Sequence, residues 1–93
     1  MGKKVVSSLK EECLRLITHT GINNLLNTER LEKCDDENSL HTLYNLLKSY
    51  NTIVQEIRNK PYYLWCRERN ALIKKLEGAG SIRDKIREVV YHL

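Results

Sequence analysis

The chain has 93 residues, of which 41% are hydrophobic and 30% are charged. This balance is typical of a single globular domain, here residues 1–93, and excludes a disordered polypeptide. No apolar run approaches the ~18 residues that a membrane-spanning helix needs, so we expect no membrane partner. The net charge of +4 lies entirely in residues 51–93, which contain nine basic and five acidic side chains. That excess favours nucleic acid or an acidic protein as partner, unless it is only a solvated helical surface.

The first half of the chain has the 3.6-residue apolar period of α-helices, and no alternating run predicts a strand. The first apolar stripe comprises Val5, Val6, Leu9, Cys13, Leu16, Ile17 and Thr20. Gly21 is expected to end this helix, which begins either before Val5 or at a capping box formed by Ser8 and Glu11. A short helix from Ile22 is then predicted to break near residues 27–28. A loop follows through residues 35–38.

The strongest element is a central helix over residues 40–58, whose broad apolar face predicts contacts with helices on two sides. Pro61 is expected at the first position of a fourth helix. Gly78 and Gly80 are expected to end that helix, and Ser81 begins a fifth with a capping box. The sequence therefore predicts an all-α fold, a compact bundle of four to five helices with short loops.

The stretch from Asn59 to Asn70, "NKPYYLWCRERN", places aromatic side chains among basic ones. A helix that begins at Pro61 directs Tyr62 and Trp65 with the core stripe of Leu72, Ile73 and Leu76. Six side chains are expected to be largely buried: Leu43, Leu47, Tyr50, Val54, Trp65 and Ile86.

The same helix directs Tyr63 elsewhere, beside Arg67 and Lys74. Arg69 projects into the apolar stripe, where a guanidinium needs a partner. We expect an internal carboxylate or carbonyl to satisfy Arg69, and the alternative is an interface with another protein.

The sequence contains few patterns that are typical of a catalytic or metal-binding site. Cys13, Cys34 and Cys66 form no CxxC pair, which favours reduced thiols and an intracellular setting, cytoplasmic or nuclear. The spacing of Cys13, His19, Cys34 and His41 matches no zinc pattern, so no metal is expected. Neither a phosphate-binding glycine loop nor a nucleophile elbow is present. We expect no catalytic residues, no cofactor and no enzymatic activity.

One segment favours a nucleic-acid-binding function. "KKLEGAGSIRDKI" resembles a helix-hairpin-helix element, in which a Gly-apolar-Gly turn offers backbone N–H groups to a phosphate. Leu76, Gly78, Ala79 and Gly80 match that turn, with Arg83 and Arg87 one helical turn apart beyond it. Asp84 departs from the motif, which has a small apolar residue at that place. The competing interpretation is an ordinary glycine-capped helical hairpin.

A small helical bundle without site chemistry is typical of a protein-interaction domain. We expect a non-enzymatic adaptor that binds another protein, or itself, through helix faces. The residues expected to bind the partner are Tyr63, Arg67, Arg69 and Lys74. The alternative is a nucleic-acid-binding domain that uses Gly78, Gly80, Arg83 and Arg87.

Overall fold

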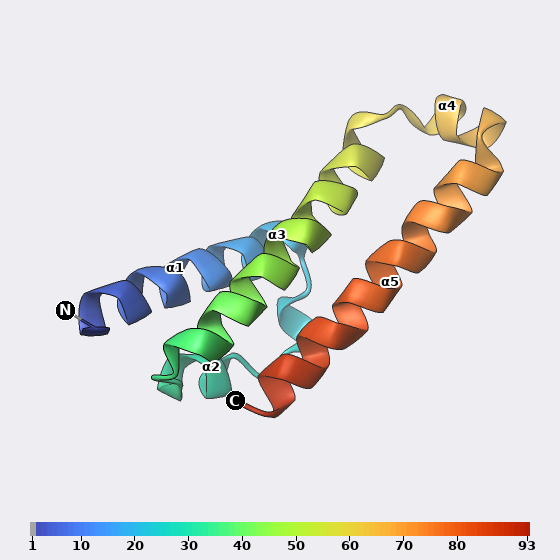
Figure 1. The fold of residues 1–93 in the computed structure, drawn as a ribbon. Helices are drawn as coiled ribbons and strands as arrows, with labels where there is room; N and C mark the ends of the chain where they lie inside the picture. The colour runs from blue at the N-terminus through green and yellow to red at the C-terminus, as the bar shows by residue number, and fades with distance from the viewer. Residues whose placement is uncertain (1) are drawn as a thin grey trace.

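The computed structural model describes residues 2–93, with side chains from residue 6 onward. Over this range the regular elements are all helical, which confirms the predicted all-α bundle with short loops (Figure 1). In chain order they are α1 (Gly2–Thr20), the 3₁₀ turn η1 (Asn23–Leu25), α2 (Thr28–Lys33), α3 (Glu37–Asn59), α4 (Tyr62–Arg67) and α5 (Arg69–Tyr91).

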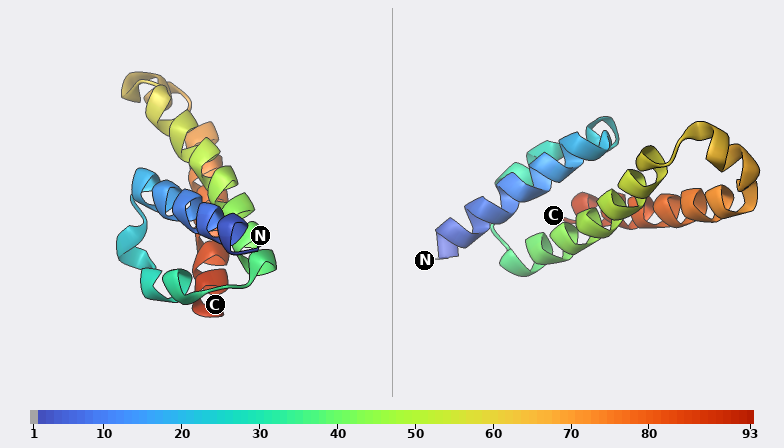
Figure 2. Two further views of the ribbon diagram at one scale, coloured as in Figure 1. Left: turned by 90° about the vertical axis from the view of Figure 1, so that its left-hand side faces the viewer. Right: turned by 90° about the horizontal axis from the view of Figure 1, so that it is seen from above.

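Helix α3 lies at the centre of the bundle, as its broad apolar face predicted. It packs against α1 and α5, and α2 contacts both of these helices. Helices α3 and α5 run antiparallel as a long pair, whereas α1 accompanies only part of α3 (Figures 1 and 2). The molecule is consequently elongated, with principal extents of 50 × 21 × 20 Å.

Side chains and one glycine set the ends of the first helices. Gly21 has a φ of 77° and ends α1, because the left-handed conformation of a helix C-cap suits glycine. Asn27 caps α2 by accepting from Glu29 N–H at 3.2 Å. Asp36 caps α3 by accepting from Asn38 N–H at 3.2 Å. The predicted loop through residue 38 is therefore too long, since α3 begins at Glu37.

The hydrophobic core fills the end of the bundle where α1, α2, α3 and α5 meet. Leu43, Leu47 and Ile86 are fully buried, and Tyr50 is 8% exposed. These four confirm the predicted core, together with Trp65, which is buried elsewhere. Val54 is only half-buried, because it lies on the part of α3 beyond the densest packing.

The predicted break at Gly78 and Gly80 is wrong, because both residues lie inside the continuous helix α5. Glycine permits a helix end but does not impose one. Ala79 between them is buried against the bundle, as are Ile86 and Val90 farther along. Packing of this one stripe holds α5 straight through the glycines. Pro61 is the N-cap of α4 rather than its first residue.

The two glycines of α5 generate a prediction about stability. A Cβ built at Gly78 meets no atom within 4 Å, and one at Gly80 meets only the Arg83 guanidinium at 3.9 Å. Because alanine fits and costs less backbone entropy in a helix, Gly78→Ala and Gly80→Ala should each stabilise the domain by about 0.5–1 kcal/mol. Chemical denaturation of both variants measures this. Destabilisation would show that α5 is interrupted there in solution.

A second prediction tests the core. Leu47 is fully buried on α3, so Leu47→Ala should lower the free energy of unfolding by about 2–5 kcal/mol. The matched control is an exposed neighbour on the same helix, Lys48→Ala, which should change stability by less than about 0.5 kcal/mol. Equal effects of the two substitutions in urea denaturation would contradict the placement of α3.

Candidate functional site

Residues 56–77, here called the distal arm, project from the bundle. The distal arm contains the end of α3, all of α4 and the first part of α5 (Figures 1 and 2). Helix α1 ends at the base of this region, where Arg58 donates to the carbonyl of His19 at 3.1 Å. Beyond that point α3 and α5 are covered by each other and by α4. An arm of two packed helices leaves more helix surface in solvent than a bundle of four does.

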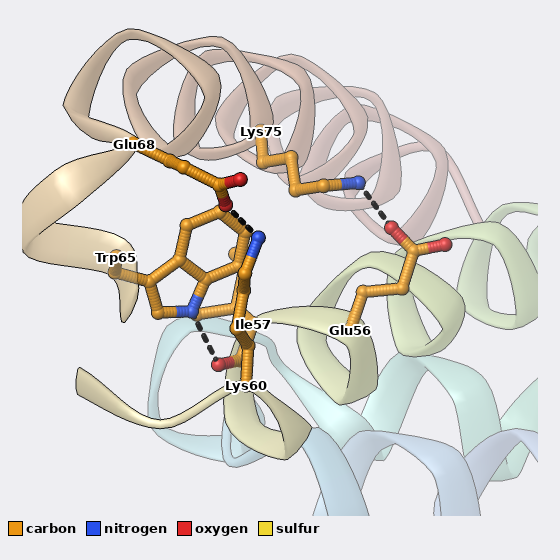
Figure 3. A network of polar contacts seen from close by, with 6 residues as sticks. All are labelled: Glu56, Ile57, Lys60, Trp65, Glu68 and Lys75. Carbon is orange, nitrogen blue, oxygen red and sulfur yellow. Dashed lines mark hydrogen bonds and ion pairs between the residues drawn. The ribbon is translucent and has the colours of Figure 1, made fainter. Parts of the chain in front are cut away.

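Trp65 fastens the tip of the distal arm. Its side chain is 4% exposed, and its indole N–H donates to the carbonyl of Ile57 at 2.9 Å (Figure 3). Carbonyls in the last turn of a helix lack intrahelical partners, so this bond satisfies the end of α3. The Lys60 ammonium lies 4.4 Å from the centre of the indole ring. Trp65 therefore belongs to the interior, as the helical periodicity predicted.

Two ion pairs link the elements of the distal arm (Figure 3). Lys60 pairs with Glu68, which occupies the break between α4 and α5. Lys75 on α5 pairs with Glu56 on α3. Both pairs are substantially solvent-exposed, and such pairs contribute little to stability. Their main consequence is that Lys60 and Lys75 are already neutralised within the arm.

The distal arm exposes an unusual share of the large hydrophobic side chains. Among residues 6–93, six such side chains are exposed, and four of them are Tyr62, Tyr63, Ile73 and Leu76. The predicted burial of Tyr62, Ile73 and Leu76 is wrong. That prediction assumed one continuous helix from Pro61 onward, but Glu68 separates α4 from α5 with φ −118° and ψ 47°. The two helices therefore have no common face.

The four predicted partner-binding residues are all exposed on the distal arm. Tyr63 and Arg67 lie one turn apart on α4. Arg69 is the first residue of α5 and stands in solvent, so the expectation that it is satisfied inside the fold is wrong. Lys74 lies about 140° around α5 from Arg69. The structure thus keeps Tyr63 and Arg67 together but separates Arg69 from Lys74.

A longer feature runs along one side of α5, and we call it the outer face of α5. It consists of Arg69, Ile73, Leu76, Gly80, Arg83 and Arg87, spaced alternately by four and three residues. Helical geometry places all six within a sector of about 80°, roughly a quarter turn from the buried stripe. The expected turn at Gly78–Gly80 concealed this face, because it divided the stripe between two helices. The alternating spacing was the signal that could have revealed it.

The outer face of α5 leads into a cleft between α5 and the η1–α2 segment. The cleft measures about 570 Å³, and Leu25, Arg30, Arg87 and Tyr91 are among its lining residues. The Arg30 guanidinium donates to the carbonyl of Tyr91 at 2.9 Å and lies 5.3 Å from the centre of its ring. Arg30 thereby caps the last turn of α5, where the helix dipole favours a cation.

The residues of the nucleic-acid alternative are not arranged as that motif requires. Gly78 and Gly80 form helix rather than a turn, so their backbone N–H groups point along the helix axis within the hydrogen-bond ladder. A phosphate cannot be cradled there as the helix-hairpin-helix resemblance implied. Arg83 and Arg87 do lie one turn apart on one side of α5, as expected.

The residues considered for metal binding or catalysis remain dispersed. Among the described residues no cluster of three His, Cys, Asp or Glu side chains could hold a metal ion. His19 Nε2 lies 2.9 Å from Gln55 Nε2, and His41 lies beside Glu37. Burial, together with the neighbouring Glu12 charge, raises the pKa of the Cys13 thiol to about 12, so this thiol is not a nucleophile at neutral pH. Within residues 2–93 no helix is both long and apolar enough to cross a membrane.

Trp65 gives a prediction about the distal arm alone. Trp65→Phe keeps an aromatic ring but leaves the Ile57 carbonyl without its donor, which should cost about 0.5–1.5 kcal/mol. We expect faster amide hydrogen exchange in residues 60–70, with exchange around Leu43 and Leu47 unchanged. Tyr63→Phe is the control, because Tyr63 is 64% exposed. Equal exchange in both variants would show that the indole bond does not hold the tip.

Comparison of the chain with protein-family models, with curated proteins and with solved structures finds no match.

Proposed function

We propose that this chain is a non-enzymatic helical interaction domain that binds a partner protein through its distal arm. The observation that carries the proposal is the exposure of Tyr62, Tyr63, Ile73 and Leu76 on that arm. Exposed hydrophobic side chains that gather in one region mark protein-binding surfaces, whereas single ones are common everywhere. Aromatic side chains and arginine are also the residues most enriched at the energetic centres of interfaces.

The charge of the distal arm supports an acidic partner. Residues 58–75 contain six basic side chains and one acidic side chain. Lys60 and Lys75 form ion pairs, and Arg58 donates to the carbonyl of His19 at 3.1 Å. Arg67, Arg69 and Lys74 have no ion-pair partner among the side chains of residues 6–93. Carboxylates on a partner would complement these three cations and speed its association.

The composition of the surface favours protein over nucleic acid. Ile73 and Leu76 are aliphatic, so they neither stack on bases nor bond to phosphates, which are the usual contacts with nucleic acid. The three unpaired cations of the distal arm would by themselves release few counterions and give weak binding at physiological salt. An aliphatic and aromatic patch with basic residues at its edge better fits a protein interface.

The test compares two double variants that carry the same added charge. Ile73→Glu/Leu76→Glu alters the distal arm, and Ser49→Glu/Thr52→Glu alters an exposed side of α3 with the same three-residue spacing. Proteins retained by the wild-type chain from a lysate of its own cells are purified and titrated against all three forms. We expect the arm variant to weaken binding by about tenfold or more, and the α3 variant by less than about twofold.

Three controls keep this test interpretable. Circular dichroism melts establish that each variant is folded, and the single variant Leu76→Gln replaces the double one if it is not. Amide hydrogen exchange of the complex should show protection in residues 62–77. The proposal fails if the purified partner binds both double variants equally. It also fails if generic DNA or RNA binds with strong salt dependence and Arg67→Glu/Lys74→Glu abolishes that binding, the outcome expected for a nucleic-acid-binding domain.

A further inference from the structure

We infer that the outer face of α5 binds one amphipathic helix of an acidic partner, apolar at its centre and acidic at both ends. The inference rests on the proposed function and adds the chemistry and shape of the partner. It follows from the order of residues along a single straight helix, where an apolar centre lies between basic ends. The distance from Arg69 to Arg87 is 18 residues, or about 27 Å at 1.5 Å per residue, which a partner helix of similar length would span.

The centre of the outer face is suited to close helix packing. Ile73 is 49% exposed and Leu76 is 52% exposed, so each has apolar surface left to bury. Gly80 follows on the same side, and the space where its Cβ would lie is open apart from the Arg83 guanidinium at 3.9 Å. Two large side chains beside a glycine make a ridge and a gap, and a helix can insert its own side chains into that gap.

The spacing of these residues also specifies a helix rather than an extended peptide. Alternation of four and three residues is the 3.5-residue repeat that keeps one seam of a helix facing a neighbouring helix that coils slightly around it. An extended strand needs an exposed sheet edge for its backbone hydrogen bonds. Within residues 2–93 the regular elements are helices, whose backbone groups are already bonded. The backbone hydrogen bonds of a partner helix are formed within that helix, so it can bind through side-chain contacts alone.

The two ends of the outer face carry positive charge. Arg69 stands at one end and Arg83 and Arg87 at the other, all without an ion pair in the described structure. Glu77, Asp84 and Glu88 are the acidic residues of α5 nearest this side. They lie about 60–100° around the helix from Arg69, so they flank one edge of the seam, and Asp84 and Glu88 line the cleft together with Arg87. The positions on the seam itself are basic at both ends. Acidic residues at both ends of a partner helix would therefore meet arginine.

The cleft at the end of the seam extends the same surface. Arg87 belongs both to the outer face and to the cleft, where Leu25 and Tyr91 are exposed beside it. A partner helix lying along α5 would reach this cleft with its last turn. Among residues 6–93, Leu25 and Tyr91 are the two exposed large hydrophobic side chains outside the distal arm. The inferred path thus ends at a second exposed apolar surface.

A second copy of this chain fits the outer face poorly. An antiparallel pair centred on Leu76 would place Arg69 of each copy near the Arg83 and Arg87 end of the other. A parallel pair would place each arginine beside itself. Like charges brought together in an interface cost binding energy in either case. The charge order therefore selects a different, acidic chain as the occupant.

Selection from a library of helical peptides with randomised charge and apolar spacing tests the inference without assuming a sequence. The wild-type chain is the bait, and the enriched peptides are synthesised and titrated. We expect apolar residues at three- and four-residue spacing, with Asp or Glu toward both ends. Arg69→Glu/Arg87→Glu should lower their affinity by about tenfold or more, whereas Lys48→Glu/Lys85→Glu, with the same charge change off the seam, should lower it by less than about threefold.

One further variant of the chain tests the shape of the outer face, and one change in the peptides tests the sign of their charge. Gly80→Leu fills the gap at the centre and should also weaken the enriched peptides by about tenfold. Replacing their terminal Glu with Lys should abolish binding to the wild-type chain and restore it to Arg69→Glu/Arg87→Glu. Thermal melts check that every variant is folded, and Gly80→Gln replaces Gly80→Leu if the latter is not.

The outcomes that overturn the inference are distinct from those that overturn the proposed function. Enriched peptides that are basic, that form no helix, or that bind both charge variants equally would refute it. Sedimentation equilibrium showing a homodimer that Leu76→Glu dissociates would refute it in favour of a second copy. If the peptides fail in these ways while the purified natural partner still requires Ile73 and Leu76, the proposed function stands and only the helical ligand is wrong. If substitution of Ile73 and Leu76 also leaves binding of the natural partner unchanged, both the proposed function and the helical ligand are wrong.

Discussion

The early end of α1 is the constraint on which the rest of this structure depends. Gly21, with its positive φ, stops α1 and returns the chain through η1 and α2 toward the start of α3. Beyond the end of α1, which lies beside Gln55 and Arg58, the last turn of α3 and the first turns of α5 are covered by each other and by α4 (Figure 1). A helix pair can bury one stripe on each member, so apolar residues of α5 that lie off its stripe stay in solvent. The exposed Ile73 and Leu76 follow from this difference in helix length.

An arm of two helices needs its own anchor, and Trp65 provides it. Most of the core lies where four elements meet, and Trp65 is buried apart from that cluster. Its ring and its single N–H both act at the end of α3, where an unpaired carbonyl would otherwise face the tip. Because Trp65 fixes the tip, the tyrosines beside it and the start of α5 have defined positions. The surface that we propose for docking is therefore preorganised, which lowers the entropy lost on binding.

Much of the fold was predictable because local signals and packing agreed. The stripe from Val6 to Thr20, the central helix and the burial of Trp65 all followed from helical periodicity, and the structure confirms them. Val5, the first residue of the predicted stripe, lies outside the described side chains. The errors arose where a local signal had to be weighed against packing. Ala79 is buried, and its contacts carry α5 through a segment that reads as a turn. Tyr62 and Ile73 were assigned to one face because the break at Glu68 has no glycine or proline to mark it.

The glycines of α5 connect that error with the proposed site. Each glycine inside a helix costs about 1 kcal/mol relative to alanine, and the surroundings of Gly78 and Gly80 would admit a Cβ. Packing within this chain therefore does not account for either residue. For Gly80 the outer face of α5 supplies a reason, since a bare backbone beside Leu76 lets a second helix approach closely. Nothing in the structure explains Gly78, which points away from that face. Binding of a partner helix would offset the helix-propensity cost of Gly80, whereas it would not offset that of Gly78.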